Sequence, residues 1–417
     1  MAAEAGRATA ADRLRAALVW LPAGLAIAAG WAYAATRLWD SSTVPDDLKL
    51  PHLDQHAYFS PGFLERSASY ERFLRIDFVL ATLVLLIVLA LYARYGERFT
   101  RESAAGRVGT GMLLGMLGFA FVWLSQLPFG IAGLWWERRH HISKQGYLEV
   151  VTGSFLGLGR QFIFVCIAIG IVMAFAGVLR QRWWMAAVPV FAALVLLSAF
   201  LQPYLTTGLE PLHNKHVAAD ARAIARKDGV PRVEVKVEKV HKQTTAPNAE
   251  SIGIGPSRRV ILWDTLLDGR FSRGEIRTIV AHEFGHVKRD HVLKGVAWVA
   301  LALIPITALI AFATRRRGGL YRPEAVPLAL FVLIAAQIAI LPLQNAVSRH
   351  VEQEADWIAL QTTRDPRAAQ AAFTELGRAS LTQPRPPKWS YLLFDTHPTI
   401  MQRIEMTKAW SQRHGDG

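Results

Sequence analysis

The chain has 417 residues, of which 52% are hydrophobic, and it carries 47 Lys and Arg against 33 Asp and Glu. A wholly soluble domain rarely needs so much apolar sequence, so the composition predicts a multi-pass membrane protein with a soluble part. A formal charge of +14 is compatible with nucleic-acid binding. However, the arginines cluster at the ends of apolar segments, as they do where helices meet a membrane surface. We therefore expect a lipid bilayer as partner and no nucleic acid.

Seven segments are long and apolar enough to cross a bilayer, which takes roughly 20 residues for about 30 Å of hydrocarbon. The third is interrupted by Gln126 and Pro128. An alternative, that some are buried helices of a soluble protein, is disfavoured because so many have the length of a span. The seven segments are 16–36, 76–95, 109–134, 161–179, 184–206, 293–313 and 324–345.

These spans divide the chain into four parts. Residues 1–206 hold five spans, and residues 293–346 form a membrane hairpin. The polar stretches 207–292 and 347–417 flank this hairpin, so we expect them to fold together. The predicted fold is mainly α: a polytopic helical bundle of about seven spans with a small α+β domain.

The first polar stretch contains signals for both helix and sheet. Residues 217–227 have the pattern of an amphipathic helix rich in Ala and Arg. Apolar residues alternate or cluster near 233–237, 252–254 and 260–262, which predicts a small sheet. A further helix begins after Ser272, because Ser272 and Glu275 have the spacing of a capping box.

This last helix carries the motif HEFGH. Residues four apart share a helix face, so His282 and His286 can bind one zinc ion. Glu283 then lies beside the attacking water as its general base. Bound zinc lowers the pKa of water to about 7 and polarises a carbonyl, as peptide hydrolysis at neutral pH requires. The only cysteine, Cys166, lies in an apolar run, which excludes a cysteine-based metal site.

A third protein ligand is expected, because catalytic zinc commonly has three and one open position. His291 lies five residues after His286, one short of the HExxHxxGxxH spacing, so we expect a solvated or interfacial side chain. Glu352 is the better candidate. It shares a helix face with Asp356, which could accept the second N–H of a ligand histidine, whereas Glu354 points elsewhere. EQEAD is also compatible with a charged helix end, but its position directly after the hairpin favours a ligand.

Six stretches in this order resemble a known family. They are EPLHNKH (210–216), the Asn-Ala pair of PNAE (247–250), RRVILWDTLL (258–267), HEFGH (282–286), the ExxAD of 352–356, and DTHPTIMQRI (395–404). The family is that of the type I CAAX prenyl proteases, integral-membrane zinc endopeptidases that include the yeast a-factor converting enzyme. The similarity covers about 200–405 well and the earlier spans loosely.

The resemblance implies roles for several residues. Glu352 becomes the third zinc ligand and Asp356 the partner of a ligand histidine. His397 and Arg403 would line the cleft near the developing oxyanion, where donors stabilise the transition state. Read alone, His397 is compatible with a turn before a helix, and Arg403 with an ion pair to Glu405 or another carboxylate.

The resemblance also implies how substrate binds. Asn248 and Ala249 would lie on or beside the strand that aligns an extended peptide, and the spans would enclose a chamber. Glu250 and Ser251 replace aromatic residues that are often found there in relatives, so only the chemistry is carried over, without the substrate preference. The Ala, Arg and Gly content suggests a bacterial cell membrane.

The membrane orientation receives two opposing predictions. By the positive-inside rule, the short basic connections would be cytoplasmic and the zinc site outside. The resemblance implies a cytoplasmic site, which we prefer and which requires the loops 37–75 and 137–160 to be inside. The basic connections are 7–15, 94–107, 180–182 and 315–322.

The expected function is a zinc-dependent endopeptidase acting on membrane-associated peptides or proteins. Two alternatives stay open: a non-catalytic zinc-binding scaffold and a transporter. A scaffold would close its zinc with four protein ligands and has no use for Glu283. A transporter would place ionisable residues inside several spans, which offer few. The sequence predicts neither the oligomeric state nor the natural substrate.

Overall fold

The computed structural model describes residues 28–100, 103–230 and 232–415. The chain consists of two units, Met1–Ser42 and Thr43–Gly417. In the first unit, residues 28–39 are helical. The first predicted span, 16–36, therefore lies largely outside the described residues.

The second unit contains the membrane helices. Five segments of the described residues are long and apolar enough to cross a membrane, and one of these, Tyr147–Leu205, contains two helices. The helices are α2 (Pro61–Tyr95), α3 (Gly106–Arg139), α4 (Tyr147–Leu179), α5 (Trp183–Leu205), α8 (His291–Thr314) and α9 (Val326–Thr363). The prediction of a polytopic helical bundle is confirmed, whereas the number of spans stays a prediction.

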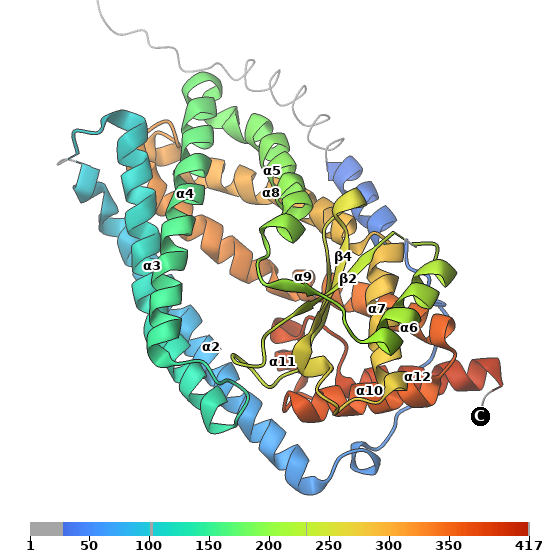
Figure 1. The fold of residues 1–417 in the computed structure, drawn as a ribbon. Coiled ribbons are helices and arrows are strands. Elements are labelled where there is room, and N and C mark those ends of the chain that lie inside the picture. Colours follow the sequence, from blue (N-terminus) through green and yellow to red (C-terminus); the bar gives the residue numbers. More distant parts are fainter. Residues whose placement is uncertain (1–27, 101–102, 231, 416–417) are drawn as a thin grey trace, which may run out of the picture. The chain divides into compact units, whose positions relative to one another are not determined.

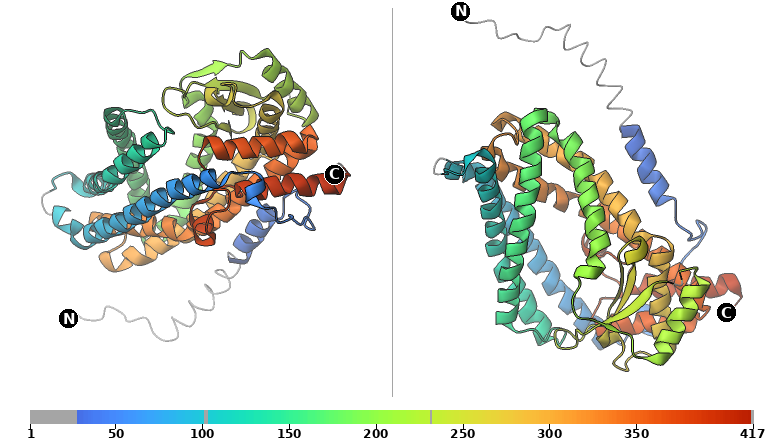
Figure 2. Two further views of the ribbon diagram at one scale, coloured as in Figure 1. Left: turned by 90° about the horizontal axis from the view of Figure 1, so that it is seen from below. Right: turned by 45° about the horizontal axis from the view of Figure 1, so that its top comes forward.

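These helices contact one another in the order α2, α3, α4, α5, α8 and α9, and α9 returns to α2 (Figures 1 and 2). Glycines on α3 permit the close approach. A Cβ at Gly111 would lie 2.4 Å from the Met173 sulfur, and one at Gly115 would lie 2.2 Å from Ile169. Without an apolar–water driving force in lipid, such small residues let helices gain van der Waals contact. A ring of helices is the arrangement that a chamber requires, and the chamber itself stays a prediction.

The small sheet has four strands in the order β1-β2-β4-β3. β2 and β4 are parallel, and β1 and β3 pair antiparallel at the two edges. β1 was not predicted, because three residues are too few to show a period of two. The strands are β1 (Leu209–Pro211), β2 (Glu234–Glu238), β3 (Ala249–Ile252) and β4 (Arg259–Trp263).

Two helices pack on this sheet, α6 (Lys215–Lys227) and α7 (Arg273–Lys288) (Figure 1). The start of α7 has the predicted capping box. The Glu275 amide donates to the Ser272 hydroxyl, and the Glu275 carboxylate accepts from the Ser272 amide at 3.0 Å. Apolar residues of α7 are fully buried against β4. The helix that carries the HEFGH motif is therefore held rigidly against the sheet.

The C-terminal helices hold the far end of α9. They are α10 (Pro366–Ala379), α11 (Lys388–Phe394) and α12 (Ile400–His414). A second apolar core contains Trp357 of α9, Phe373 of α10 and Met401 of α12, each at most 1% exposed. α9 is continuous across residue 346, so one helix carries the chain from the membrane into this core.

Candidate metal centre

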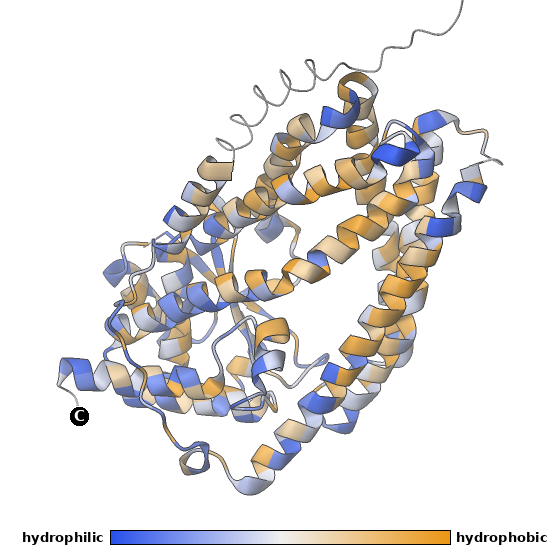
Figure 3. Ribbon diagram, turned by 180° about the vertical axis from the view of Figure 1, so that it is seen from behind, coloured by the Kyte–Doolittle hydropathy of each residue, from blue (hydrophilic) through white to orange (hydrophobic). Residues whose placement is uncertain are grey.

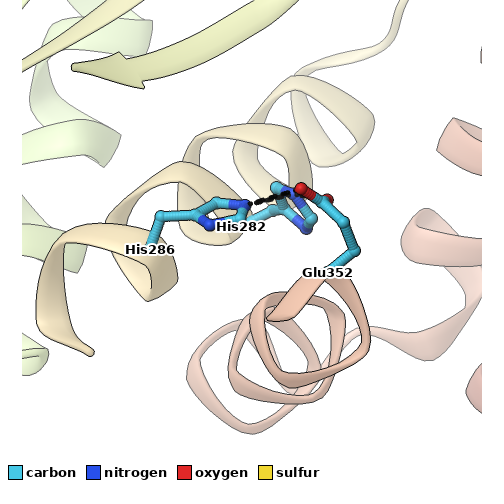
Figure 4. A group of neighbouring side chains, drawn as sticks. All are labelled: His282, His286 and Glu352. Carbon is cyan, nitrogen blue, oxygen red and sulfur yellow. Dashed lines mark hydrogen bonds and ion pairs between the residues drawn. The ribbon is translucent and has the colours of Figure 1, made fainter. Parts of the chain in front are cut away.

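His282 and His286 lie on successive turns of α7, and Glu352 reaches them from α9 (Figure 4). Nε2 of His286 lies 3.0 Å from Nε2 of His282. A Glu352 carboxylate oxygen, Oε2, lies 3.1 Å from the same atom of His282, and Oε1 lies 3.6 Å from Nε2 of His286. The three side chains form a group with one converging ligand atom each.

Gly285 brings the two helices close enough for this convergence. A Cβ at this position would meet the backbone of Ala355 at 3.3 Å and the Ile358 side chain at 3.4 Å. Any larger side chain would push α9 away from α7. The glycine inside HEFGH therefore helps to set the distance from Glu352 to the histidines.

Asp356 binds the outer nitrogen of His282. Its Oδ1 lies 2.8 Å from Nδ1 of His282, and the Arg403 guanidinium donates to both of its oxygens at 2.7 and 2.9 Å. Burial disfavours the charged imidazole, but the carboxylates of Asp356 and Glu352 outweigh it and raise the pKa of His282 to about 10. The site thus attracts positive charge.

His291 binds the outer nitrogen of His286. Its Nδ1 lies 2.9 Å from Nδ1 of His286, and its Nε2 lies 2.8 Å from a Glu354 oxygen. The side chain is buried, so the prediction of a solvated or interfacial histidine is wrong. Glu354 points away from the histidine pair of α7, as predicted, but it holds this third histidine and also accepts from Arg289 at 2.8 Å.

The error on His291 has a clear physical cause. The prediction assumed that one helix continues through this residue, whereas α7 ends at Lys288. Asp290 adopts a left-handed backbone with φ 55°, which Asp tolerates better than most residues, and α8 begins at His291 in a new direction. The carboxylates of EQEAD were a signal that buried partners lie nearby. The turn at Asp290, however, has no strong sequence signature.

The hydrogen bonds assign the tautomers of the three histidines. A carboxylate accepts only, so Nε2 of His291 donates to Glu354 and its Nδ1 accepts from Nδ1–H of His286. Likewise Nδ1–H of His282 donates to Asp356. When His282 loses the Nε2 proton that its raised pKa favours, both Nε2 lone pairs face each other, and Oε2 of Glu352 is buried beside them without a hydrogen bond. Two imidazoles with a carboxylate are a donor set that fits zinc.

Glu283 directly follows His282 on α7, and its side chain is buried. Ser251 of β3 lies close enough to influence its pKa. Burial raises the pKa of Glu283, while the neighbouring His282 and His286 work in the opposite direction. Ser251 was not predicted as a site residue. Its place opposite Glu283 depends on how β3 packs on α7, which the sequence does not reveal.

The remaining predicted residues lie around this group. Nε2 of His397 is 3.3 Å from Oε2 of Glu352, and the side chain is about half exposed (56%). Arg403 is buried and pairs with Asp356, whereas Glu405 pairs with Arg385. Asn248 is exposed and directly precedes β3; its carbonyl accepts from the Trp263 amide at 3.0 Å. Ala249 is the first residue of that edge strand.

Comparisons with known proteins agree with this geometry. Residues 211–411 match the model of Peptidase family M48. The uncharacterized metalloprotease YhfN of Bacillus subtilis (strain 168) is 25% identical over 410 residues, which cover 91% of this chain and 95% of that protein. A CAAX prenyl protease 1 homolog of Arabidopsis thaliana is 25% identical over 318 residues, covering 70% of this chain and 72% of that protein.

The fold has a solved counterpart. A crystal structure of S. mikatae Ste24p matches with a TM-score of 0.66 and 16% identity, covering 91% of this chain and 96% of that one. Together these findings define an integral-membrane metalloprotease. Residues 211–411, which hold the site, match the model of Peptidase family M48, and the resemblance to CAAX prenyl proteases is confirmed.

Proposed function

We propose that this protein is a zinc-dependent endopeptidase that hydrolyses peptide bonds of membrane-associated peptides or proteins. His282, His286 and Glu352 would bind one zinc ion, and Glu283 would be the general base. The observation that carries the proposal is the convergence of Nε2 of His282, Nε2 of His286 and a carboxylate oxygen of Glu352. In the described part of the chain this group offers three ligands, which leaves one position open, as in catalytic zinc sites.

Zinc, when bound, acts as a Lewis acid that lowers the pKa of water and polarises the scissile carbonyl. Glu283 takes a proton from the attacking water and delivers it to the leaving amine. Burial raises its pKa, which makes the carboxylate a stronger proton acceptor for the first of these steps.

Asp356 and His291 hold the two ligand histidines in the required tautomer. Each accepts the Nδ1 proton of one imidazole, which directs the Nε2 lone pair to the metal. For Arg403 we propose a positioning role through Asp356, because two of its N–H groups are engaged by that carboxylate. His397, half exposed beside Glu352, is then the donor for the developing oxyanion.

Substrate would bind along β3. This strand pairs with β4 on one side only and is an edge of the sheet. An extended peptide can add to such an edge through main-chain hydrogen bonds, starting near Asn248 and Ala249. α7 contacts β3, so a peptide bound there passes beside Glu283.

Replacement of Glu283 by Gln tests the proposal. The E283Q protein should still bind one zinc ion, while peptide cleavage falls by roughly 10²–10⁴ because the general base is lost. Zinc content and turnover of a quenched fluorescent peptide are measured on the same preparation. E275Q on the same helix is the control, since Gln also completes a capping box and should leave cleavage intact. Wild-type turnover by E283Q would remove Glu283 from the role of base.

A further inference from the structure

Three connections between membrane helices meet at the end of the bundle away from the metal centre (Figures 1 and 3). They are η2 (Gly96–Thr100) after α2, η3 (Arg180–Arg182) between α4 and α5, and the α8–α9 loop with η6 (Arg315–Arg317) and η7 (Pro323–Ala325). η2 contacts η7, and η3 contacts α8. Arg317 also donates to the Ala93 carbonyl at 2.6 Å.

The described residues of these connections carry far more arginines than carboxylates. Figure 3 shows their hydrophilic ribbons above the hydrophobic helices. Such an excess at one end of the spans marks a surface that attracts anions. The arginines are Arg94, Arg98, Arg107, Arg180, Arg182, Arg315, Arg316, Arg317 and Arg322, and the carboxylates are Glu97 and Glu324.

Two of these arginines are held on one aromatic ring. The guanidinium carbons of Arg107 and Arg180 each lie 4.0 Å from the centroid of the Tyr321 ring. Arg107 also donates to the Tyr321 carbonyl at 3.5 Å, and its guanidinium lies against Gly177 of α4. The ring fixes both guanidinium planes by cation–π contact and so reduces the entropy lost when they bind a ligand.

Within the described residues this pair has no counter-charge, because neither Arg107 nor Arg180 lies within ion-pair distance of a carboxylate there. Each guanidinium has five N–H groups, and the hydrogen bond from Arg107 to the Tyr321 carbonyl uses only one of them. Two cations held on the same ring repel each other, and an anion between their edges would relieve that repulsion.

The position of the pair indicates the kind of anion. Arg180 directly follows the apolar end of α4, where Val178 is 82% exposed, and Phe312 of α8 is 63% exposed below Arg315. Arginines above exposed apolar side chains suit one lipid molecule, whose headgroup would contact the arginines and whose acyl chains would contact the apolar side chains. We propose that Arg107, Tyr321 and Arg180 form a binding site for the phosphodiester of an anionic phospholipid. The bound lipid joins α3, α4 and the α8–α9 loop.

Native mass spectrometry of the full chain tests this site with dioleoylphosphatidylglycerol as probe and dioleoylphosphatidylcholine as the neutral lipid. The wild type should retain phosphatidylglycerol, and R107Q/R180Q should bind it about tenfold more weakly. The control R66Q/R139Q removes two positive charges from the opposite ends of α2 and α3, and it should bind as the wild type does. Unchanged binding by R107Q/R180Q, or an equal loss in the control, overturns the proposal.

A second pair of variants, at Tyr321, tests the site even if R107Q/R180Q does not fold. Y321F keeps the ring and should retain the lipid, whereas Y321L removes the ring and should lose most of it. Equal retention by both contradicts the site. Soluble glycerol phosphate, added as a competitor without acyl chains, should not displace the lipid. Displacement at similar concentrations would show a site for free phosphate esters and would overturn the assignment to a lipid.

Discussion

At the scale of single residues, the direction of the hydrogen bonds determines which histidine nitrogens face the metal centre. Spacing alone predicted His282, Glu283 and His286, because a helix puts residues four apart on one face. Glu352 was found from its position after the hairpin and from the family resemblance. His291 was missed, since its contact with His286 depends on the left-handed turn at Asp290.

Removal of His291 should weaken metal binding without abolishing the fold of the site. H291F keeps the ring volume but leaves the Nδ1 proton of His286 unpartnered. We expect zinc affinity to fall by about 10–100-fold, as for other partners of ligand histidines. Competition with a fluorescent chelator measures this affinity. H216F, on the exposed start of α6, is the control. Wild-type affinity of H291F would show that His291 does not orient His286.

The acid limb of the pH profile should reflect Glu283. This carboxylate must be ionised to act as a base, and burial raises its pKa above the ordinary value. As the pH falls through that raised pKa, Glu283 gains a proton and kcat/KM decreases. The decrease in kcat/KM should therefore begin at a higher pH than it would for an ordinary glutamate, whose pKa is near 4.3. Full activity down to pH 4 at saturating zinc would contradict this assignment.

At the scale of elements, the meeting of α7 and α9 positions the third ligand. α9 has 38 residues, so at 1.5 Å per residue it is roughly 57 Å long. It carries Glu352 and Asp356 rigidly from the membrane to α7. The sequence predicts a span and a separate soluble part here, because the hydropathy changes near residue 346, whereas the helix continues to Thr363.

Gly285→Ala tests how closely α7 and α9 pack against each other. The added methyl group would press on the Ala355 backbone at 3.3 Å, so α9 must shift by a few tenths of an ångström. We expect the free energy of unfolding to decrease by about 1–3 kcal/mol, together with weaker zinc binding. G295A on α8 is the matched control, since nothing lies within 4 Å of its added methyl group. Equal melting temperatures of both variants would contradict the tight packing.

At the scale of the whole molecule, composition and hydropathy predicted the class of fold, because long apolar segments have few alternatives to crossing a bilayer. The ring-like order of the helices could not be predicted. It depends on which faces pack together, for example the glycines of α3 against α4. The small sheet was predicted at β2 and β4, whereas the predicted run 252–254 overlaps β3 only at Ile252. β1 was missed, because its three residues gain their order only from pairing with β2.

The orientation in the membrane is testable with a reporter fused after residue 417. The arginines gather at the end away from the metal centre, which by the positive-inside rule favours a centre outside the cytoplasm. We prefer the cytoplasmic arrangement that the family resemblance implies. Green fluorescent protein, which becomes fluorescent in the cytoplasm, should then be bright at this position. A dark fusion, together with an active alkaline phosphatase fusion, would contradict this preference.

The central claim is that two histidines of α7 and a glutamate of α9 share one metal ion. Anomalous diffraction at the zinc edge from zinc-soaked crystals tests it directly. We predict one strong peak within about 2.0–2.2 Å of Nε2 of His282, Nε2 of His286 and a Glu352 oxygen, with a fourth position free of protein ligands. A peak that excludes Glu352, or a zinc ion closed by a fourth protein side chain, would contradict the account.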